Sequence, residues 1–258
     1  MEIITSKNNN TIKLVTKLIN NKKDRDEKGL FICETYRVFK QLENLNLEYV
    51  FIILNKNTKY FNEFKNKKNI YVVDEKIFNS ISVLKSSDGI ILCYKKIKNE
   101  LKLEKKDKYI ILDKIQNPKN LGNICRTACA FGITNLIIIN GSVDIYNIET
   151  IRSSMGSVFN VKIYYSTNLK IVLEKLDNLQ IPTYATSLTR NAKSILETKF
   201  PSSFAIGFGN EGNGIDKNDL VRFKNNIFIP ISSNVDSLNI NNAVAITLFV
   251  ATNCNFTI

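Results

Sequence analysis

The first half of the chain alternates short apolar runs with segments whose apolar residues recur every three or four positions. In residues 11–21, apolar side chains at positions 12, 14, 15, 18 and 19 form the stripe of an amphipathic helix. A charged run with Gly29 as a turn follows, and helical periodicity returns at residues 36–45. Short apolar runs predict strands at residues 30–33, 49–54, 70–73 and 89–94. The pattern therefore predicts a small α/β unit of about 95 residues.

A charged segment separates this unit from the rest of the chain. Residues 95–108 are dominated by Lys and Glu and carry little apolar pattern. Such a composition favours a solvated linker, with an exposed charged helix as the competing interpretation. We therefore expect an N-terminal domain at residues 1–95, a linker at 96–108 and a second domain at 109–258.

Beyond the linker, strands and helices alternate in longer units. Apolar runs predict strands at 109–112, 136–139, 161–164, 183–186, 204–208 and 227–231. Helical patterns fall at 121–131, 148–154, 169–179 and 239–252. This alternation predicts a parallel sheet covered on both faces. In such sheets, ligands bind beyond the carboxyl ends of the strands.

Three polar loops follow strands at that predicted edge: 113–120, 209–214 and 232–237. The second has three glycines in six residues, a composition that lets backbone turn sharply or approach a ligand closely. A tight turn is the ordinary explanation of such a loop. The third loop leads into an apolar helix, whose first N–H groups are free to bind a ligand. Together the loops predict a small-molecule pocket.

Composition limits the class of protein. The chain has 258 residues, 44% of them hydrophobic, as in soluble globular proteins. It has no apolar run of the roughly 20 residues that span a bilayer, and its first residues lack the apolar core of a signal peptide. Five scattered cysteines without a C-x-x-C pair indicate reduced core thiols. We expect a cytoplasmic protein.

Two further features bear on chemistry. The chain has no histidine, which excludes Ser-His-Asp and Cys-His nucleophilic sites and histidine metal sites. Its net charge of +12 favours a phosphate-rich partner such as nucleic acid. The alternative source of that charge is a Lys-, Asn- and Ile-rich composition typical of an A/T-rich genome.

The three loops together resemble a known family. Residues 117–126, NPKNLGNICR, resemble the first motif of the SpoU (TrmH-like) RNA ribose 2'-O-methyltransferases, and residues 209–214 resemble the second. Residues 229–240 resemble the third, and 152–157 resemble a segment between the first and second. Their order makes the resemblance specific over residues 109–255. More loosely, the first part of the chain, with SKNNNTIK near its start and FICE at residues 31–34, resembles a ribosomal-protein-like RNA-binding domain that many members carry.

The resemblance implies a SPOUT-class α/β fold: a C-terminal parallel-sheet domain with a trefoil knot and a smaller N-terminal α/β RNA-binding domain. It also implies S-adenosyl-L-methionine as cofactor, an RNA substrate and a homodimer. Methyl transfer from a sulfonium to a hydroxyl needs no metal, and the composition predicts no membrane partner. The sequence departs from the family pattern at Asn117, which is commonly Asp, and at Asp236, which is usually Glu. Small or apolar residues are usual at the positions of Asn241 and Asn242, and glycine is usual at Thr35.

The resemblance also implies roles for individual residues. Arg126 would contact the ribose and a phosphate, with proton acceptance a less natural role because guanidinium stays protonated. Without the motif, Arg126 would be a surface ion-pair residue, Asn120, Ser237 and Asn239 helix caps, and Glu211 a solvated loop acid. The expected catalytic residues are Arg126, Asn120, Glu211, Ser237 and Asn239, and the expected cofactor-binding residues are Gly209, Asn210, Gly212, Ile229, Ile231 and Leu238.

The predicted function is S-adenosylmethionine-dependent ribose 2'-O-methylation of RNA, with ribosomal RNA of the large subunit as the expected substrate. A tRNA ribose 2'-O-methyltransferase is one alternative, and a non-catalytic RNA-binding protein with the same fold is another. A nucleotide-binding enzyme with a phosphate loop is disfavoured, because the chain lacks G-x-x-x-x-G-K-[ST] and a G-x-G-x-x-G after the first strand of a βαβ unit.

Overall fold

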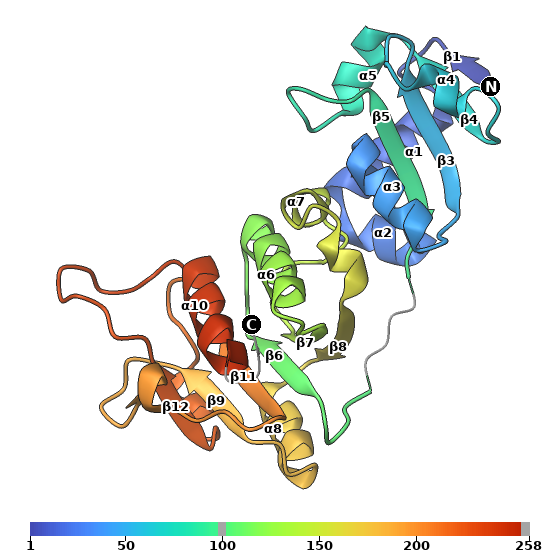
Figure 1. Cartoon of the computed structure of the whole chain (residues 1–258). Helices are drawn as coiled ribbons and strands as arrows, with labels where there is room; N and C mark the ends of the chain where they lie inside the picture. Colours follow the sequence, from blue (N-terminus) through green and yellow to red (C-terminus); the bar gives the residue numbers. More distant parts are fainter. Residues whose placement is uncertain (98–101, 254–258) are drawn as a thin grey trace. The chain divides into compact units, whose positions relative to one another are not determined.

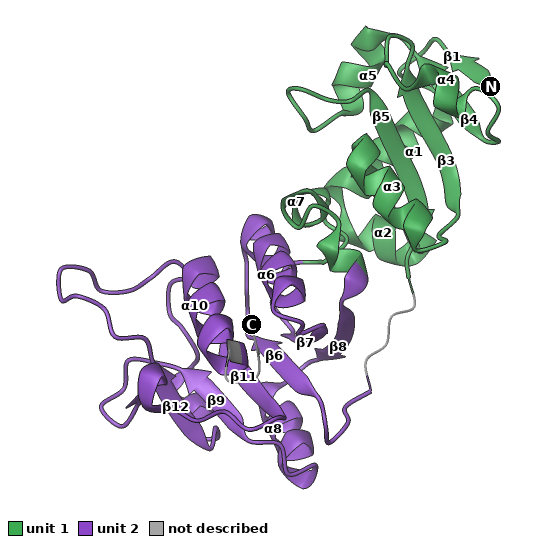
Figure 2. Ribbon diagram, viewed as in Figure 1, with its two compact units in different colours: residues 1–98, 144–159 green, residues 99–143, 160–258 purple. Residues whose placement is uncertain are grey.

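The computed structural model describes residues 1–97 and 102–253. Its chain divides into two compact units (Figures 1 and 2). The first comprises residues 1–98 and 144–159, and the second comprises residues 99–143 and 160–258. Residues 144–159 thus lie within the second half of the sequence but pack with the first unit. Part of the predicted linker, residues 98–101, lies outside the described residues, and residues 102–107 form no helix.

The first unit contains a mixed five-stranded sheet in the order β1-β4-β3-β5-β2. Strand β5 runs antiparallel to β3 and β2, and the other pairs are parallel. The strands are β1 (Glu2–Ile4), β2 (Leu30–Glu34), β3 (Tyr49–Asn55), β4 (Ile70–Val73) and β5 (Ile90–Lys95). The helices are α1 (Asn10–Asn20), α2 (Lys22–Lys28), α3 (Tyr36–Asn44), α4 (Phe61–Phe64), α5 (Glu75–Ile81) and α7 (Ile148–Ser153), followed by the short 3-10 helix η1 (Ser157–Asn160). The predicted small α/β unit is confirmed.

Local sequence explains the first two helices. The buried face of α1 consists of Ile12, Val15 and Leu18, the spacing expected of an amphipathic helix. Helix α2 lies in the charged run before Gly29, where the sequence pattern did not predict a helix. The Asn21 side chain caps its start, and Gly29, with a φ of 62°, ends it in the left-handed conformation.

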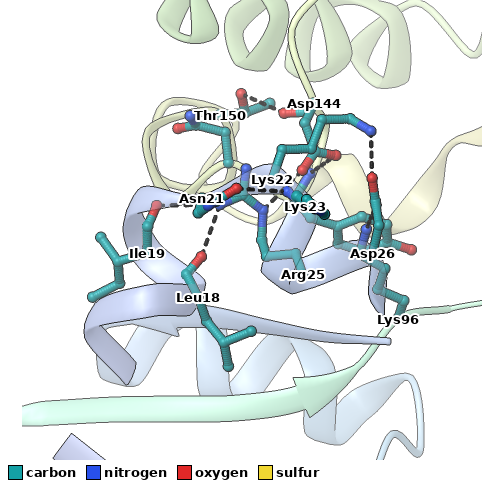
Figure 3. Close-up of polar contacts among 12 residues, drawn as sticks. Leu18, Ile19, Asn21, Lys22, Lys23, Arg25, Asp26, Lys96, Asp144 and Thr150 are labelled. Atoms are coloured by element: carbon teal, nitrogen blue, oxygen red, sulfur yellow. Dashed lines mark hydrogen bonds and ion pairs between the residues drawn. The ribbon is translucent and has the colours of Figure 1, made fainter. Parts of the chain in front are cut away.

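One cation of this charged run is buried. The Arg25 Nε donates to Asp144 Oδ2 at 2.9 Å, and its Nη1 donates to the Leu18 carbonyl at 2.7 Å (Figure 3). Both ionic side chains are almost fully buried. The pair joins α2 to the segment 144–159 within the first unit.

The second unit contains a seven-stranded sheet in the order β10-β12-β9-β11-β6-β7-β8, with every pair parallel. Buried residues that include Tyr109, Ile137 and Leu173 form a hydrophobic cluster between the sheet and the helix at residues 169–178. The strands are β6 (Lys108–Leu112), β7 (Asn135–Ile139), β8 (Lys162–Ser166), β9 (Thr183–Thr186), β10 (Lys193–Ser194), β11 (Phe204–Phe208) and β12 (Asn225–Phe228). The predicted parallel-sheet α/β domain is confirmed, and the trefoil knot stays a prediction.

The described residues of this unit also form the α-helices α6 (Pro118–Ala130), α8 (Leu169–Asn178), α9 (Lys217–Leu220) and α10 (Ile240–Asn253), together with the 3-10 helix η2 (Ile195–Glu197). Helix α10 packs against α6. Because β11 lies between β9 and β6, with β12 beside β9, the loops that follow these strands share one edge of the sheet. The loops expected at 113–120 and 209–214 follow β6 and β11 at this edge, and the one expected at 232–237 lies beyond β12, which ends three residues earlier than predicted.

Two boundaries differ from the sequence prediction near this edge. Helix α6 starts at Pro118, which the pattern placed in a loop; proline fits the first helical position because no N–H bond is needed there. Strand β12 covers Asn225–Phe228 rather than residues 227–231. Pro230 lacks an N–H for a sheet ladder, so the chain leaves the sheet before it. Among the described residues, no helix is long and apolar enough to span a membrane.

Candidate active site

Two adjoining cavities lie at the carboxyl edge of the second unit's sheet. One has a volume of about 390 Å³ and the other about 670 Å³. They share a wall made by Glu211, Ser237, Leu238 and Ile240. A ligand in one cavity would therefore lie next to a ligand in the other, an arrangement suited to transfer of a group between two molecules.

The smaller cavity, named here the inner cavity, is lined by all the residues expected to bind the cofactor: Gly209, Asn210, Gly212, Ile229, Ile231 and Leu238. Its wall also includes Thr186, Ser187, Leu188 and Thr189, which sequence reasoning did not single out. These four residues end β9 or follow it. The parallel-sheet pattern contained the signal for them, because β9 ends at the same edge as its neighbours.

The loop at residues 209–214 is closed on itself. The backbones of Asn210 and Gly214 exchange two hydrogen bonds, at 3.1 and 2.9 Å. The Asn210 Oδ1 accepts from the Gly212 N–H at 2.9 Å, and its Nδ2 donates to the Lys114 carbonyl at 3.0 Å. A Cβ at Gly209 would overlap backbone atoms of Gly214 and Ile215, so this position requires glycine. The loop is thus both a tight turn and a cavity wall.

The larger cavity, named here the outer cavity, is lined by Asn120, Glu211, Ser237 and Asn239. These are four of the five residues expected to act in catalysis. They come from α6, from the loop after β11 and from the segment before α10. The structure therefore gathers residues from all three sequence motifs around one space.

Glu211 ties two of the motifs together. Its Oε1 accepts from Asn120 Nδ2 at 3.0 Å and from the Asn117 N–H at 3.3 Å, and its Oε2 accepts from the Gln116 N–H at 3.4 Å. Partial burial acts to raise the pKa of this carboxyl, but the hydrogen bonds outweigh that effect and the net pKa is lowered. Glu211 is therefore an anionic acceptor that fixes the loop around it, and a poor base at neutral pH.

Asparagine side chains cap both helices at the site. The Asn117 Oδ1 accepts from the Lys119 N–H at 2.9 Å at the start of α6. The Asn239 Oδ1 accepts from the Asn241 N–H at 2.9 Å at the start of α10. Asn239 thus combines the helix-capping role with a place on the outer cavity. Asn120 is not a cap, because it lies within the first turn of α6 and bonds other side chains.

Arg126 lies further along α6, with an exposed side chain. It lines neither cavity. Of the expected catalytic residues, it alone is not brought to the two cavities. Its guanidinium is available to a partner that reaches beyond the cavity mouth.

Comparison with known proteins places this site in a family. Residues 107–249, more than half of the chain, match the model of the SpoU rRNA Methylase family. Residues 9–92 match the model of the MRM3-like substrate binding domain. The chain belongs to the SpoU rRNA Methylase family.

Individual relatives agree with this assignment. The chain is 28% identical over 250 residues to the 23S rRNA (guanosine(2553)-2'-O)-methyltransferase RlmP of Bacillus subtilis (strain 168), covering 96% of this chain and 98% of that protein. It is 29% identical over 159 residues to a tRNA (guanosine(18)-2'-O)-methyltransferase of Thermus thermophilus, covering 61% of this chain and 80% of that protein. The AdoMet-bound rRNA methyltransferase structure from Sinorhizobium meliloti has the same fold, with a TM-score of 0.84, 23% identity and 99% of each chain covered. The predicted family and enzyme class, an RNA 2'-O-methyltransferase, are confirmed.

Proposed function

We propose that this chain transfers the methyl group of S-adenosylmethionine to a ribose 2'-hydroxyl of large-subunit ribosomal RNA. The observation that carries the proposal is the pair of adjoining cavities with a common wall. One cavity would hold the methyl donor and the other the ribose. Direct displacement requires the donor and acceptor to be aligned, and the shared wall supplies a fixed boundary for both.

The inner cavity suits the cofactor. Its volume of about 390 Å³ lies within the usual range for small-molecule pockets. Its wall combines apolar residues, such as Leu188 and Leu238, with the glycine-rich loop at 209–214. The residues that would hold the cofactor are Gly209, Asn210, Gly212, Ile229, Ile231 and Leu238. The cofactor would supply an activated methyl group on a sulfonium.

The outer cavity suits the ribose. Ser237 and Asn239 supply polar side chains that would orient the 2'-hydroxyl, and Asn120 and Glu211 would shape the pocket around it. Arg126, exposed on α6, would contact a phosphate of the RNA as it enters. The easier role for its guanidinium is electrostatic, because that group stays protonated.

The substrate class rests on three observations. The Bacillus subtilis relative, which aligns over nearly the whole chain, is by name a 23S rRNA methyltransferase, whereas the Thermus tRNA enzyme aligns with 61% of this chain. The match of residues 9–92 to a substrate-binding domain supports RNA binding by the first unit. The net charge of +12 favours a polyanionic partner.

We also propose a homodimer, assembled through α10. Ile246 and Phe249 are 38% and 54% exposed on this helix, although both are large and apolar. They lie three positions apart and so share a face. Such a face is typical of a surface that another subunit covers. Phe249→Asp should convert a dimer to a monomer in sedimentation, and a wild-type protein that sediments as a monomer at micromolar concentration would contradict the proposal.

The variant Arg126→Ala tests the division of labour between cavity and helix surface. It should lose nearly all methyl transfer to RNA while binding S-adenosylmethionine with little change, because Arg126 lies outside the inner cavity. Calorimetry would measure cofactor binding, and incorporation of a labelled methyl group would measure transfer. Full activity of this variant would remove Arg126 from the proposed catalytic set.

A further inference from the structure

Asn241, in the first turn of α10, reaches the active site through another side chain. Its Nδ2 donates to Asn120 Oδ1 at 2.8 Å. The Asn120 Nδ2 in turn donates to Glu211 Oε1 at 3.0 Å. Asn241 itself lines neither cavity, whereas Asn120 and Glu211 both line the outer one. The three side chains form one hydrogen-bonded row from α10 across α6 to the loop after β11.

The direction of this row is fixed from the Glu211 end. An ionised carboxylate only accepts hydrogen bonds, so the Asn120 amide must present its Nδ2 to Glu211. The Asn120 Oδ1 then faces Asn241, which must donate. The two backbone N–H groups of Gln116 and Asn117 that also point at Glu211 favour its charged form. Each amide therefore has one allowed orientation.

The other half of the Asn241 amide makes no compensating bond. Its Oδ1 is occluded from solvent and has no hydrogen-bond partner among residues 1–97 and 102–253. An occluded, unpaired oxygen is unfavourable, and an apolar side chain would avoid it. The hydrogen bond from Asn241 Nδ2 to Asn120 Oδ1 is thus the one polar interaction that the Asn241 side chain makes within the described structure.

We propose that Asn241 is a positioning residue of the methyl-transfer site: it holds the Asn120 amide turned toward Glu211, so that both side chains keep their places on the outer cavity. The role in catalysis rests on the proposed function, whereas the hydrogen-bonded row does not. Loss of the Asn241 donor should leave the inner cavity unchanged and disorder Asn120 at the outer one.

Two substitutions separate this role from simple packing. Asn241→Leu keeps the side chain's size but removes the donor, and should lower kcat/KM for RNA by about threefold to tenfold with cofactor affinity kept. Asn241→Asp replaces the donor by an acceptor. Asn120 must then turn its Nδ2 to the new carboxylate, or its Oδ1 and a carboxylate oxygen face each other. The decrease in kcat/KM for RNA should therefore be larger, on the order of 30-fold or more. Asn242→Asp adds the same charge at the neighbouring exposed position and serves as the matched control.

A compensating change tests the direction of the row. In Glu211→Gln, the new amide can donate to Asn120 Oδ1, which frees Asn120 Nδ2 to donate to an aspartate at position 241. Glu211→Gln will itself lower activity, but the additional loss caused by Asn241→Asp should fall below about threefold in that background. Equal losses from Asn241→Asp in the wild-type and Glu211→Gln backgrounds would overturn the proposal.

A titration independent of catalysis completes the test. Glutamate would be labelled with ¹³C, and the Glu211 carboxyl resonance would be assigned from its absence in Glu211→Gln. The pKa of Glu211 should be higher in Asn241→Asp than in Asn242→Asp. Both variants would be measured in the same oligomeric state. Equal pKa values in those two variants would contradict the row of hydrogen bonds. If wild-type protein methylates no RNA, the proposed function fails while this titration still decides the position of Asn241. Full kcat/KM in a folded Asn241→Leu variant would remove its role in catalysis.

Discussion

Arg25 and Asp144 form a buried ion pair although 119 positions separate them in the sequence: Arg25 Nε donates to Asp144 Oδ2 at 2.9 Å (Figure 3). The pair joins α2 to the segment 144–159, which leaves the second unit's sheet after β7 and returns to it at β8. The first unit therefore contains chain from both halves of the sequence. The chain crosses between the two units three times, rather than once through a single linker.

The first prediction concerns this pair. Arg25→Met leaves Asp144 buried without its cation and should lower the free energy of unfolding by about 3–5 kcal/mol. Arg25→Met combined with Asp144→Asn should recover much of the loss, because the amide oxygen can still accept from the Tyr146 N–H. Urea unfolding followed by circular dichroism measures both values. A double variant that is no more stable than Arg25→Met would contradict this account of the pair.

The second prediction concerns pH. Glu34 is buried, and burial raises the pKa of its carboxyl even though the Val83 N–H and the Ser82 hydroxyl donate to it. Because this pKa is higher in the folded protein than in the unfolded chain, Glu34 stabilises the folded protein at low pH. That contribution to the free energy of unfolding is lost as pH rises from about 4 through the folded-state pKa. Glu34→Gln does not titrate there. The free energy of unfolding of Glu34→Gln should therefore rise relative to that of wild type as pH rises from about 4 toward 7.

Unfolding curves of both proteins across that pH range would measure the difference. Groups that do not interact with Glu34 cancel, so the pH dependence of the difference reports Glu34 together with its coupling to Arg152 and Glu149. A difference that shrinks as pH rises would show that the carboxyl is held charged in the folded protein.

The third prediction concerns the loop at 209–214. Gly209→Ala places a Cβ against the backbone of Gly214 and Ile215 and should lower the free energy of unfolding by about 1–3 kcal/mol. Gly212→Ala is the matched control for stability, since a Cβ there meets only Asn210 Oδ1, at 3.5 Å. Denaturant unfolding measures both variants. Equal stability of the two would contradict the close backbone approach at Gly209.

How far the sequence predicts this fold depends on the range of the interactions. Strands Ile70–Val73, Thr183–Thr186 and Phe204–Phe208 match the predicted ranges, because each is a short run of strand-forming residues bounded by polar residues, proline or glycine. Strand Glu2–Ile4 was not predicted, because it has three residues and pairs with β4, about seventy positions away. The burial of Arg25 was equally hidden, because a pattern of charges in a local run contains no information about a partner more than a hundred residues away.

The candidate site shows the same division. Family motifs led to ten residues that line the two cavities, and the position of their loops followed from the parallel-sheet pattern. The segment Thr186 to Thr189 and the link from Asn241 to Asn120 were not predicted. Cavity walls and side-chain hydrogen bonds depend on which loops meet in space, and single motifs do not specify this.

The measurement that tests the central claim most directly is methyl incorporation. Purified protein would be incubated with radiolabelled S-adenosylmethionine and either ribosomal RNA or tRNA from cells lacking the gene, and the RNA would be digested to nucleosides. We expect label in a 2'-O-methylnucleoside of large-subunit rRNA. Label in tRNA alone, or label on a base instead of the ribose, would contradict the central claim.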